Sequence, residues 1–529
     1  MSGTLDWSRR AFGLAAMGAA MAPALAARAE AAPLAAGLVD DVRRRFDVPG
    51  IAVALVEQGR PVLASGFGVR GLTDPRPVDA HTVFPIASNT KAFTSALLAT
   101  LVDEGKLGWD GHVVDYLPGF QMWDEWVTRE MTVRDLLVHR SGLGLGEGDL
   151  MLFPKTTFTP KELVAHLRWL KPKTSFRSTY AYDNVLYEAV AVLVEAVTGQ
   201  SWSDALRQRI LGPVGMTDAV IGESAFFAAP DHALPHAKID ASDRGAGKLS
   251  VLTTTNVGDV LLSAGGLAAS AADLSRWLMT QVNGGLAPDG KRVFTEAQGA
   301  QMWKPQTLIP PSDIGAAGWP QPQYRAYALG WEVADIDGLM MVRHGGYVQG
   351  FKSYTVVIPS QKTGFVVLTN AEEGYGISAI ALSLLDHYQG RPARDRVSQL
   401  LAARDADRAE TLAAGAGIPR DPGARPTLQL SAYAGVYRDA WYGTTTLTMR
   451  DGGLWMRFDR TPGMEGPLEP WRYDTFRTRW KLPGVEDAFV TFALTPEGGV
   501  RDMTMRAVSP LADFSFDYQD LLFRPAAAG

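Results

Sequence analysis

Residues 85–107 read PIASNTKAFTSALLATLVDEGKL, and this stretch decides the fold that the sequence predicts. Its apolar side chains recur at four-residue spacing, at Phe93, Leu97 and Leu101. That spacing predicts an amphipathic helix over residues 90–104, with the apolar stripe facing a core. Ser88 then lies at or just inside the helix N-terminus. Lys91, three residues later, returns to the same face one turn away.

A serine one helical turn from a lysine can support nucleophilic catalysis. At a helix N-terminus, the free backbone N–H groups and the positive end of the helix dipole favour developing negative charge. The Lys91 ammonium can orient the Ser88 hydroxyl or, if desolvated and partly neutral, accept its proton. S-x-x-K also arises by chance. In the alternative interpretation, Ser88 with Asn89 caps the helix and Lys91 is a solvated residue of the first turn.

A Tyr-x-Asn unit, Tyr182 and Asn184, leads into a second apolar helix predicted over residues 183–198. Side chains two positions apart in an extended segment point the same way. The phenol and the amide could therefore share a proton with the serine and lysine and hold a substrate carbonyl or amide. The alternative is an aromatic core residue followed by a helix-capping asparagine.

A third stretch, RHGGYVQGF at residues 343–351, leads into a predicted pair of strands. Gly345 and Gly346 would let the backbone and a substrate approach closely along a strand edge. The alternative is a glycine-rich turn in which His344 is incidental.

In this order, the three units resemble the motif boxes of the penicillin-recognising serine hydrolases, which include class C β-lactamases, DD-peptidases and related esterases. The boxes of that superfamily are S-x-x-K, Y-x-N and K-T-G or a relative such as H-x-G. Residues 132–142, TVRDLLVHRSG, are similar to the stretch that ends H-T-S-G. Residues 211–218, LGPVGMTD, are similar to the P-L-G-M-x-x-T segment. The resemblance covers roughly residues 35–390.

The strand and helix patterns predict an α+β fold for this region. Residues 51–56 and 61–65 read as one hairpin near the start, and residues 354–358 and 364–369 as another near the end. A mainly helical stretch lies between them. We therefore expect strands from both ends to pair in one antiparallel sheet, flanked by helices and carrying a helical subdomain. The resemblance implies the same β-lactamase/DD-peptidase-like fold.

The resemblance also implies a role for each matching residue. Ser88 would be the nucleophile that becomes acylated, and Lys91 and Tyr182 would accept and return its proton. Which of these two is the base stays open. Asn184 would help to hold the substrate. The backbone N–H groups of Ser88 and Tyr347 would form the oxyanion hole, where losing one donor typically costs about 3 kcal/mol of transition-state stabilisation.

The third box departs from the pattern of the β-lactamases. Where those enzymes carry K-T-G, this chain has His344, Gly345 and Gly346. The fixed ammonium that would attract a β-lactam or peptide carboxylate is replaced by a weaker, titratable imidazole. This departure disfavours an efficient β-lactamase and leaves esterase and peptidase activity open.

Composition excludes several classes of function. The chain has 529 residues, of which 46% are hydrophobic, so it can bury a large core and divide into more than one domain. The formal charge of -6 arises from 51 basic and 57 acidic residues without a basic block, which argues against a nucleic-acid partner. There is no cysteine, and the closest histidines, His232 and His236, are separated by a proline. We expect no metal site and no cofactor.

The N-terminus resembles an export signal. Residues 8–14, SRRAFGL, run into a short apolar stretch that closes with Ala27, Arg28 and Ala29. This is typical of a twin-arginine signal with a small-residue cleavage site. We expect a signal peptide over residues 1–29 and a soluble, periplasmic mature protein without stable membrane insertion. The alternative is an uncleaved anchor, for which the stretch is short and rich in alanine.

The rest of the chain is predicted to contain a serine hydrolase domain, a linker and a small all-β, barrel-like domain, at residues 30–400, 401–427 and 428–529. The linker is polar and rich in alanine, with glycine and proline in its later half. Polar and apolar side chains alternate in residues 444–449 and 454–458, on either side of a glycine turn. This pattern predicts a hairpin. Segments 430–443 and 471–476 resemble the C-terminal β domain of many lactamase-like hydrolases.

The leading hypothesis is an exported serine hydrolase that cleaves an amide, peptide or ester bond through an acyl-enzyme on Ser88. Its substrate would be a small molecule or peptide, with peptidase ahead of esterase and weak β-lactamase activity. A second hypothesis is a non-hydrolytic ligand-binding or sensor protein of the same fold. A third assigns the function to the C-terminal β domain, whose Trp441 and Trp471 are more typical of a core. The oligomeric state stays open.

Overall fold

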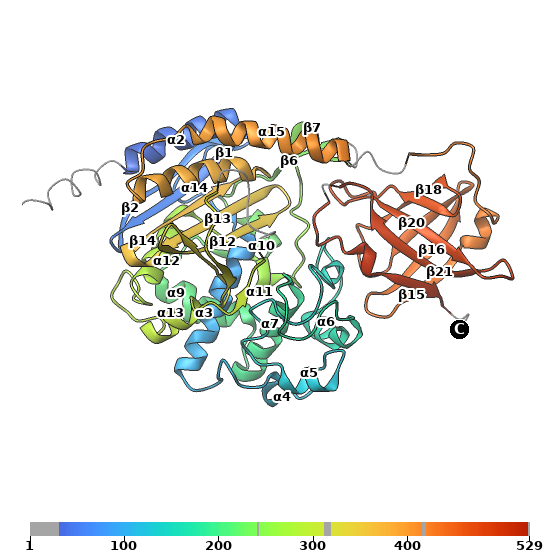
Figure 1. Ribbon diagram of the computed structural model, residues 1–529, viewed down its shortest axis with the longest axis horizontal. Helices are drawn as coiled ribbons and strands as arrows, with labels where there is room; N and C mark the ends of the chain where they lie inside the picture. The colour runs from blue at the N-terminus through green and yellow to red at the C-terminus, as the bar shows by residue number, and fades with distance from the viewer. Residues whose placement is uncertain (1–30, 241–242, 311–318, 415–418, 511, 527–529) are drawn as a thin grey trace, which may run out of the picture.

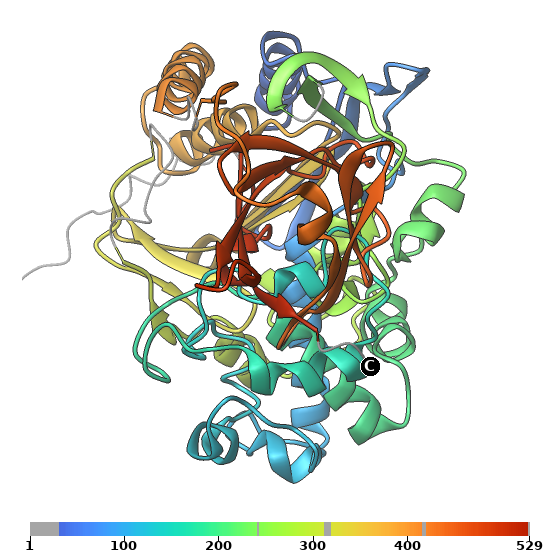
Figure 2. The same cartoon turned by 90° about the vertical axis from the view of Figure 1, so that its right-hand side faces the viewer.

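The structure is a computed structural model that describes residues 31–240, 243–310, 319–414, 419–510 and 512–526 (Figure 1). The predicted export signal lies outside these residues. Among the residues described, no helix combines the length and apolar character needed to cross a membrane. Figure 1 and the turned view in Figure 2 show a large mixed domain with a C-terminal barrel against one side of it.

The large domain is built around an antiparallel sheet. Within the described residues, nine strands form it in the order β3-β2-β1-β14-β13-β12-β11-β10-β9. The strands are β1 (Gly50–Glu57), β2 (Arg60–Gly71), β3 (Asp74–Pro77), β9 (Thr307–Leu308), β10 (Arg325–Tyr327), β11 (Glu332–Ile336), β12 (Leu339–Val348), β13 (Phe351–Ile358) and β14 (Thr363–Thr369).

Strands from the two ends of the domain meet at the centre of this sheet. β1 pairs with β14 in a register that runs from Ile51 opposite Thr369 to Val56 opposite Gly364. Both strands are almost wholly buried, which explains why their sequences are apolar without a clear alternation. The predicted pairing of the first and last hairpins is confirmed.

Helices cover both faces of the sheet. One face packs against α2 (Ala31–Arg45) and α14 (Gly374–Tyr388), which α15 (Arg396–Ala414) contacts in turn. The other face packs against α12 (Ala271–Val282), and Phe93 of α3 (Thr90–Asp103) stacks on Trp277 of α12. Successive residues of β1 contribute to the two cores in turn, with Ile51, Val53 and Leu55 on the first face and Ala52, Ala54 and Val56 on the second. The expected α+β architecture is confirmed.

Helix α15 occupies part of the predicted linker. The predicted boundary at residue 400 lies inside this helix, which continues to Ala414. Val397 and Leu400 are buried in the core that α15 shares with α2 and α14. The alanine, leucine, arginine and glutamate content that makes this segment look like a polar linker also gives it high helix propensity.

A helical subdomain occupies the middle of the chain. Its helices are α4 (Val113–Tyr116), α5 (Glu125–Glu130), α6 (Pro160–His166), α7 (Val185–Thr198), α8 (Trp202–Leu206), α9 (Gly212–Val214), α10 (Glu223–Ala228), α11 (Leu262–Gly265) and α13 (Glu296–Met302). Short strands accompany them: β4 (Phe84–Pro85), β5 (Val220–Ile221), β6 (His236–Asp240), β7 (Asp243–Val251) and β8 (Leu267–Ala269). Helix α7 ends at Thr198, as predicted, and is followed by Gly199, whose φ of 70° is left-handed.

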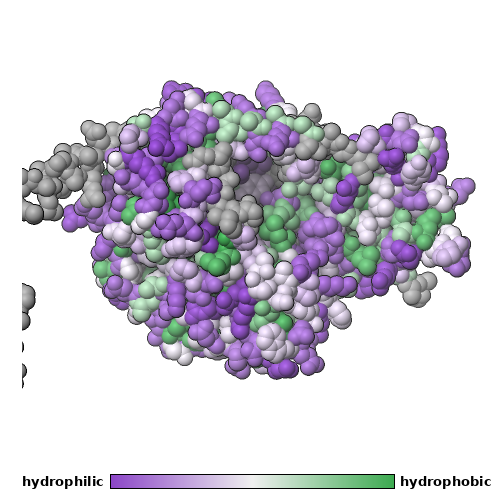
Figure 3. Space-filling view, viewed as in Figure 1, coloured by the Kyte–Doolittle hydropathy of each residue, from purple (hydrophilic) through white to green (hydrophobic). Residues whose placement is uncertain are grey.

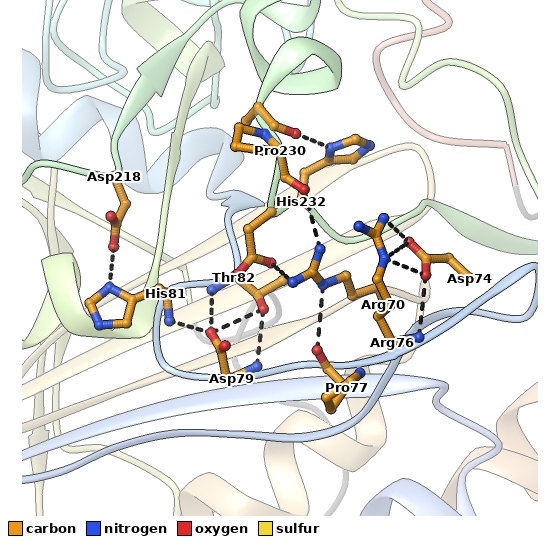
Figure 4. A network of polar contacts seen from close by, with 12 residues as sticks. Arg70, Asp74, Arg76, Pro77, Asp79, His81, Thr82, Asp218, Pro230 and His232 are labelled. Atoms are coloured by element: carbon orange, nitrogen blue, oxygen red, sulfur yellow. Dashed lines mark hydrogen bonds and ion pairs between the residues drawn. The ribbon is translucent and has the colours of Figure 1, made fainter.

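A polar network fastens the β3 edge of the sheet to the middle of the chain (Figure 4). The Arg70 guanidinium pairs with Asp231 at 2.8 Å and donates from Nε to the Pro77 carbonyl at 3.4 Å. His81 Nδ1 lies 2.8 Å from a carboxylate oxygen of Asp218, and this hydrogen bond raises the pKa of His81. These contacts tie β2 and the segment after β3 to residues 218 and 231 of the middle of the chain.

The C-terminal domain is a closed antiparallel barrel, which confirms the barrel-like prediction. Its strands are β15 (Gly435–Asp439), β16 (Gly443–Arg450), β17 (Gly453–Phe458), β18 (Glu465–Arg472), β19 (Thr475–Thr478), β20 (Ala488–Leu494), β21 (Val500–Ala507) and β22 (Leu522–Pro525). Trp441, Tyr433 and Tyr442 are buried in its core. These three aromatic residues therefore stabilise the barrel, whereas Trp471, also expected in the core, is only half-buried.

Ion pairs and hydrogen bonds join the barrel to the helical subdomain. Arg460 of the barrel donates to the Thr157 carbonyl at 3.0 Å and pairs with Glu162 at 2.9 Å. Lys173 of the large domain pairs with Asp520 of the barrel at 2.7 Å. The barrel is thus held directly over the connection that precedes α7.

Candidate active site

Ser88 lies in a short 3-10 turn, η2 (Ala87–Asn89), that leads from β4 into α3. The preceding residue, Ala87, has a φ of +49°. A non-glycine residue in the left-handed region is strained, and such strain is concentrated at functional sites. This turn leaves the Ser88 side chain half-buried on the wall of a cavity.

Lys91 is fully buried, so the interpretation of a solvated first-turn lysine is wrong. Its Nζ donates to Ser88 Oγ at 3.1 Å, to Asn184 Oδ1 at 2.7 Å and to the Ala264 carbonyl at 3.2 Å. None of these three acceptors carries a full charge. Burial lowers the pKa of Lys91 from 10.5 to about 7, against the raising effect of nearby carboxyl groups.

Tyr182 and Asn184 flank Lys91 just before α7. The Lys91 Nζ lies 4.8 Å from the centre of the Tyr182 ring. Among the described residues, the Tyr182 hydroxyl has no hydrogen-bond partner of good geometry. Burial raises its pKa well above 10, and the nearby Ser88 hydroxyl opposes that shift. The structure therefore brings both residues of the Tyr-x-Asn unit to the serine and lysine.

Three buried carboxyl groups, which the sequence analysis missed, surround this cluster. Asp149 accepts a hydrogen bond from Asn184 Nδ2 at 2.8 Å, and Asp183 and Glu188 act on Lys91 through space. Burial raises the pKa of each of the three carboxyls to about 7. Of the three, only Asp183 has a sequence signal, because it lies inside the Tyr-x-Asn unit.

His139, in the segment similar to H-T-S-G, packs against the tyrosines of the site. Its ring centre lies 4.2 Å from that of Tyr182 and 4.2 Å from that of Tyr327. Its Nδ1 accepts a hydrogen bond from the Asp183 backbone N–H at 3.2 Å. Burial lowers the pKa of His139 well below 6.5, so it is a neutral ring that fixes the plane of Tyr182.

The third motif unit lies on the C-terminal half of β12. This half extends beyond the residues of β12 that pair with β11. β11 pairs with residues 339–343 only, which leaves residues 344–348 paired on the β13 side. A side-chain carbon on Gly346 would come within 2.2 Å of the Ile86 carbonyl, so only glycine lets this strand lie against η2. Gly345 is exposed to the cavity, as is expected of a substrate-facing edge.

The charge of His344 differs from the expectation that its imidazole would be a weak cation for a substrate carboxylate. The side chain is 6% exposed, and its Nε2 lies 2.7 Å from the Tyr327 hydroxyl. Its Nδ1 lies 2.6 Å from the Gly345 carbonyl. Burial and the nearby Lys91 lower its pKa to about 4. The imidazole is therefore neutral near pH 7 and supports the strand, and it supplies no positive charge.

A cavity of about 910 Å³ joins these residues. Figure 3 shows a mainly hydrophilic surface that is hollowed near the middle of this view, below α15. Next to Ser88 the cavity has an apolar wall formed by Leu145, Leu152, Phe153, Val257 and Leu261. Its charged lining comes from Arg325, Glu332 and Arg343 of β10 to β12 and from Lys352 of β13. In the described ranges, no cluster of three histidine or acidic side chains is placed to hold a metal ion.

A sequence model of the family described as Beta-lactamase matches residues 35–386, the region that contains every residue of the cluster around Ser88. The chain belongs to the beta-lactamase family. A second model, described as Domain of unknown function (DUF3471), matches residues 419–525, which contain the barrel. The resemblance proposed from the three motif units is confirmed.

Relatives of this beta-lactamase family member include named hydrolases. The unguisins hydrolase ungD of Aspergillus violaceofuscus is 27% identical over 79% of this chain and 76% of its own. Penicillin-binding protein 4 of Amycolatopsis lactamdurans is 30% identical over 63% of this chain and 83% of its own. With the family match, these relatives identify the chain as a serine hydrolase.

A solved structure shares the fold over nearly the whole chain. It is the octameric penicillin-binding protein homologue from Pyrococcus abyssi, with a TM-score of 0.59 and 20% sequence identity. The match covers 93% of this chain and 99% of that one. Both the hydrolase domain and the barrel of this family member therefore lie within the shared architecture.

Proposed function

We propose that this serine hydrolase is exported and cleaves an amide, peptide or ester bond through an acyl-enzyme on Ser88. The observation that carries the proposal is the position of Lys91 Nζ, 3.1 Å from Ser88 Oγ in a fully buried site. A buried amine with a lowered pKa beside a serine hydroxyl is the arrangement that activates a serine nucleophile.

In the acylation step, Ser88 Oγ attacks the substrate carbonyl carbon as its proton leaves for the buried cluster. The backbone N–H groups of Ser88 and Tyr347 stabilise the oxyanion of the tetrahedral intermediate. When the intermediate collapses, the bond to the leaving amine or alcohol breaks and the leaving group takes the proton. Water then attacks the ester formed on Ser88 and gives up a proton to the same cluster. The bond between the acyl carbon and Ser88 Oγ breaks, Oγ takes that proton, and the acid product leaves.

Lys91 is the better candidate for the proton acceptor. The pKa of Tyr182 lies well above 10, so its phenol stays protonated near pH 7. Lys91, with a pKa of about 7, is partly neutral at the same pH. Tyr182, whose hydroxyl lies near that of Ser88, then passes the proton to the leaving group. Asn184 holds the neutral amine through its Oδ1 atom.

The activity should depend on pH through this buried cluster. Because the pKa of Lys91 is lowered to about 7, the base form dominates above pH 7 and disappears below it. We expect kcat/KM to rise with pH and level off above an apparent pKa near 7. The titration belongs to Lys91 and Asp149 together, whose pKa values are both near 7. A rate that stays constant from pH 5.5 to 9 would contradict this assignment.

Peptides and other amides are the first substrates to test. The related ungD and penicillin-binding protein 4 carry names that refer to hydrolysis and to penicillin binding. We propose peptidase activity ahead of esterase and weak β-lactamase activity. The experiment compares kcat/KM for a D-alanyl peptide, a short-chain aryl ester and nitrocefin. Preference for nitrocefin over both other substrates would reverse this order.

Lys352 supplies the positive charge that His344 lacks. It lies on β13 directly opposite Tyr347, the residue after the third motif unit, and lines the cavity. Its Nζ is 5.7 Å from the centre of the Tyr347 ring. In the part of the chain that the structure describes, no carboxylate lies within ion-pair distance of this ammonium. We propose that it attracts an anionic group of the substrate.

Replacing Lys352 with methionine should lower kcat/KM roughly tenfold for a peptide with a free C-terminal carboxylate, because a hydrogen bond to a charged group is lost. The amidated form of the same peptide should change by much less. Lys304→Met is the matched control, because Lys304 is exposed outside the cavity. An equal effect of Lys352→Met on both peptides would show that this lysine does not select for charge.

Export rests on the twin-arginine-like residues 8–14. Edman or mass-spectrometric sequencing of the protein from the native cell should find its N-terminus after Ala29, in the periplasmic fraction. An intact N-terminus in the cytoplasmic fraction would contradict this proposal.

A non-hydrolytic ligand-binding protein is the second candidate. It is disfavoured because Ser88, Lys91, Tyr182 and Asn184 are all present and joined in one cluster. Acylation without release of product, or ligand binding that is insensitive to Ser88→Ala, would favour this second function.

A further inference from the structure

One loop of the C-terminal barrel reaches into the active-site cavity. It comprises residues 512–517 and lies between β21 and the 3-10 turn η9 (Tyr518–Asp520). Asp513, Phe514 and Ser515 line the cavity together with Ser88 and Tyr182. The barrel therefore supplies part of the wall that a bound substrate would meet.

The end of this loop holds a turn of the large domain. Asp517 is fully buried and accepts hydrogen bonds from the Gly148 N–H at 2.7 Å and the Leu150 N–H at 3.0 Å. These two residues flank Asp149, which is 1% exposed. One carboxylate of the barrel thus fixes the backbone on both sides of Asp149.

The middle of the loop contacts Asp149 directly. Ser515 Oγ donates to Asp149 Oδ2 at 2.8 Å, and the same oxygen accepts from Asn184 Nδ2 at 2.8 Å. Asn184 Oδ1 in turn accepts from Lys91 Nζ at 2.7 Å, and Lys91 reaches Ser88 at 3.1 Å. An unbroken chain of hydrogen bonds therefore runs from the barrel to the nucleophile.

Phe514 forms the apolar side of the same loop. Its ring centre lies 5.9 Å from that of Tyr182. A side-chain carbon on Gly146, whose φ is +66°, would come within 2.7 Å of the Phe514 ring, so the two segments are in close contact. The side chain is 40% exposed and faces the cavity. It occupies space beside Tyr182 that a bulky substrate group would need.

We propose that residues 512–517 complete the active site, with Ser515 as a positioning residue for Asn184 and Lys91 and with Phe514 as a wall that restricts substrate size. The inference rests on the proposed function, because it assumes acylation of Ser88. It assigns the barrel a direct part in rate and specificity.

The test of Ser515 uses the full chain and p-nitrophenyl butyrate. Loss of one hydrogen bond to the buried Asp149 should lower kcat roughly tenfold in Ser515→Ala and change KM by less than about twofold. Ser515→Thr keeps the hydroxyl and should recover most of the loss. Ser431→Ala, an exposed serine of the barrel, is the matched control and should behave as the unmodified protein. An unchanged kcat in Ser515→Ala, or a Ser515→Thr variant as slow as Ser515→Ala, would overturn this role.

The test of Phe514 uses two pairs of esters, one differing in the size of the acyl group and one in the size of the leaving group. Phe514→Ala should shift the kcat/KM ratio of at least one pair about tenfold toward the larger member. Met449→Ala is the matched control, because Met449 is also 40% exposed and lies on β16. Unchanged kcat/KM ratios for both pairs of esters would overturn the proposed role of Phe514 in restricting substrate size, whatever the result for Ser515.

Mass spectrometry separates a failure of this inference from a failure of the proposed function. If the unmodified protein forms no acyl adduct on Ser88, the proposed function fails and the inference fails with it. If the adduct forms equally fast in the unmodified protein and in Ser515→Ala, and Phe514→Ala keeps the original ratios, only the inference is overturned.

Discussion

Replacing Ser88 with alanine is expected to reduce hydrolysis of p-nitrophenyl butyrate by a factor on the order of 10⁴ to 10⁶, because no nucleophile remains to form the acyl-enzyme. The half-buried hydroxyl accepts one hydrogen bond from Lys91, so its removal leaves the packing of η2 and α3 almost unchanged. Release of p-nitrophenolate under single-turnover conditions measures the effect directly.

The matched control for this experiment is Ser360→Ala. Ser360 is an exposed serine of the same domain, in the 3-10 turn η7 (Pro359–Gln361) after β13. Its replacement should leave both turnover and thermal unfolding unchanged. If Ser88→Ala keeps most of the activity and folds normally, Ser88 is not the nucleophile.

Replacing Lys91 with methionine should slow acylation by a factor of about 10² to 10⁴, because proton transfer from Ser88 loses its acceptor. Methionine is chosen because it fills a fully buried site without a charge. The residual activity should also lose the rise through pH 7, since the amine whose neutral form acts as the base is gone. Stopped-flow measurement of the acylation burst across pH 5.5 to 9 tests both effects.

Two further variants separate a proton acceptor from a fixed cation. Lys91→Arg keeps the positive charge but cannot lose its proton near neutral pH, so it should be as slow as Lys91→Met. Tyr182→Phe removes the hydroxyl that returns the proton and should slow the reaction while keeping the rise through pH 7. An active Lys91→Arg variant would show that the lysine acts only as a cation.

The central sheet and the serine and lysine could be predicted because their signals are local. The spacing of apolar residues after Ser88 predicts α3, and α3 begins at Thr90 as expected. Helix α7 ends at Thr198, the predicted end of the second apolar helix. Apolar runs at both ends of the domain predicted the pairing of β1 with β14. In each of these cases, the pattern along the chain is set by the face that is buried.

The supporting shell of the site could not be predicted, because distant segments form it. Asp149 accepts a hydrogen bond from Ser515, although the two residues are 366 positions apart in the sequence. Neither residue belongs to a motif. The neutral state of His344 depends on burial and on the nearby Lys91, which the residues around His344 do not encode. The charge state of a buried side chain, and its contacts with residues outside the motifs, depend on packing and can be determined only in the folded chain.

The barrel illustrates the same limit at the level of domains. Alternating residues predicted its strands, and the buried Trp441 agrees with a role in the core. Its loop at residues 512–517 contains no sequence pattern that predicts a position beside Ser88. Hydrogen bonds of Asp517 and Ser515 hold that loop against the large domain, and the ion pairs of Arg460 and Lys173 join the two domains at other sites far apart in sequence.

Intact-protein mass spectrometry during turnover of p-nitrophenyl butyrate tests the central claim most directly. The full chain should gain the mass of one butyryl group, the modified peptide should contain Ser88, and Ser88→Ala should show no gain. Turnover without a covalent adduct under rapid acid quench, or an adduct of equal yield in Ser88→Ala, would contradict acylation of Ser88.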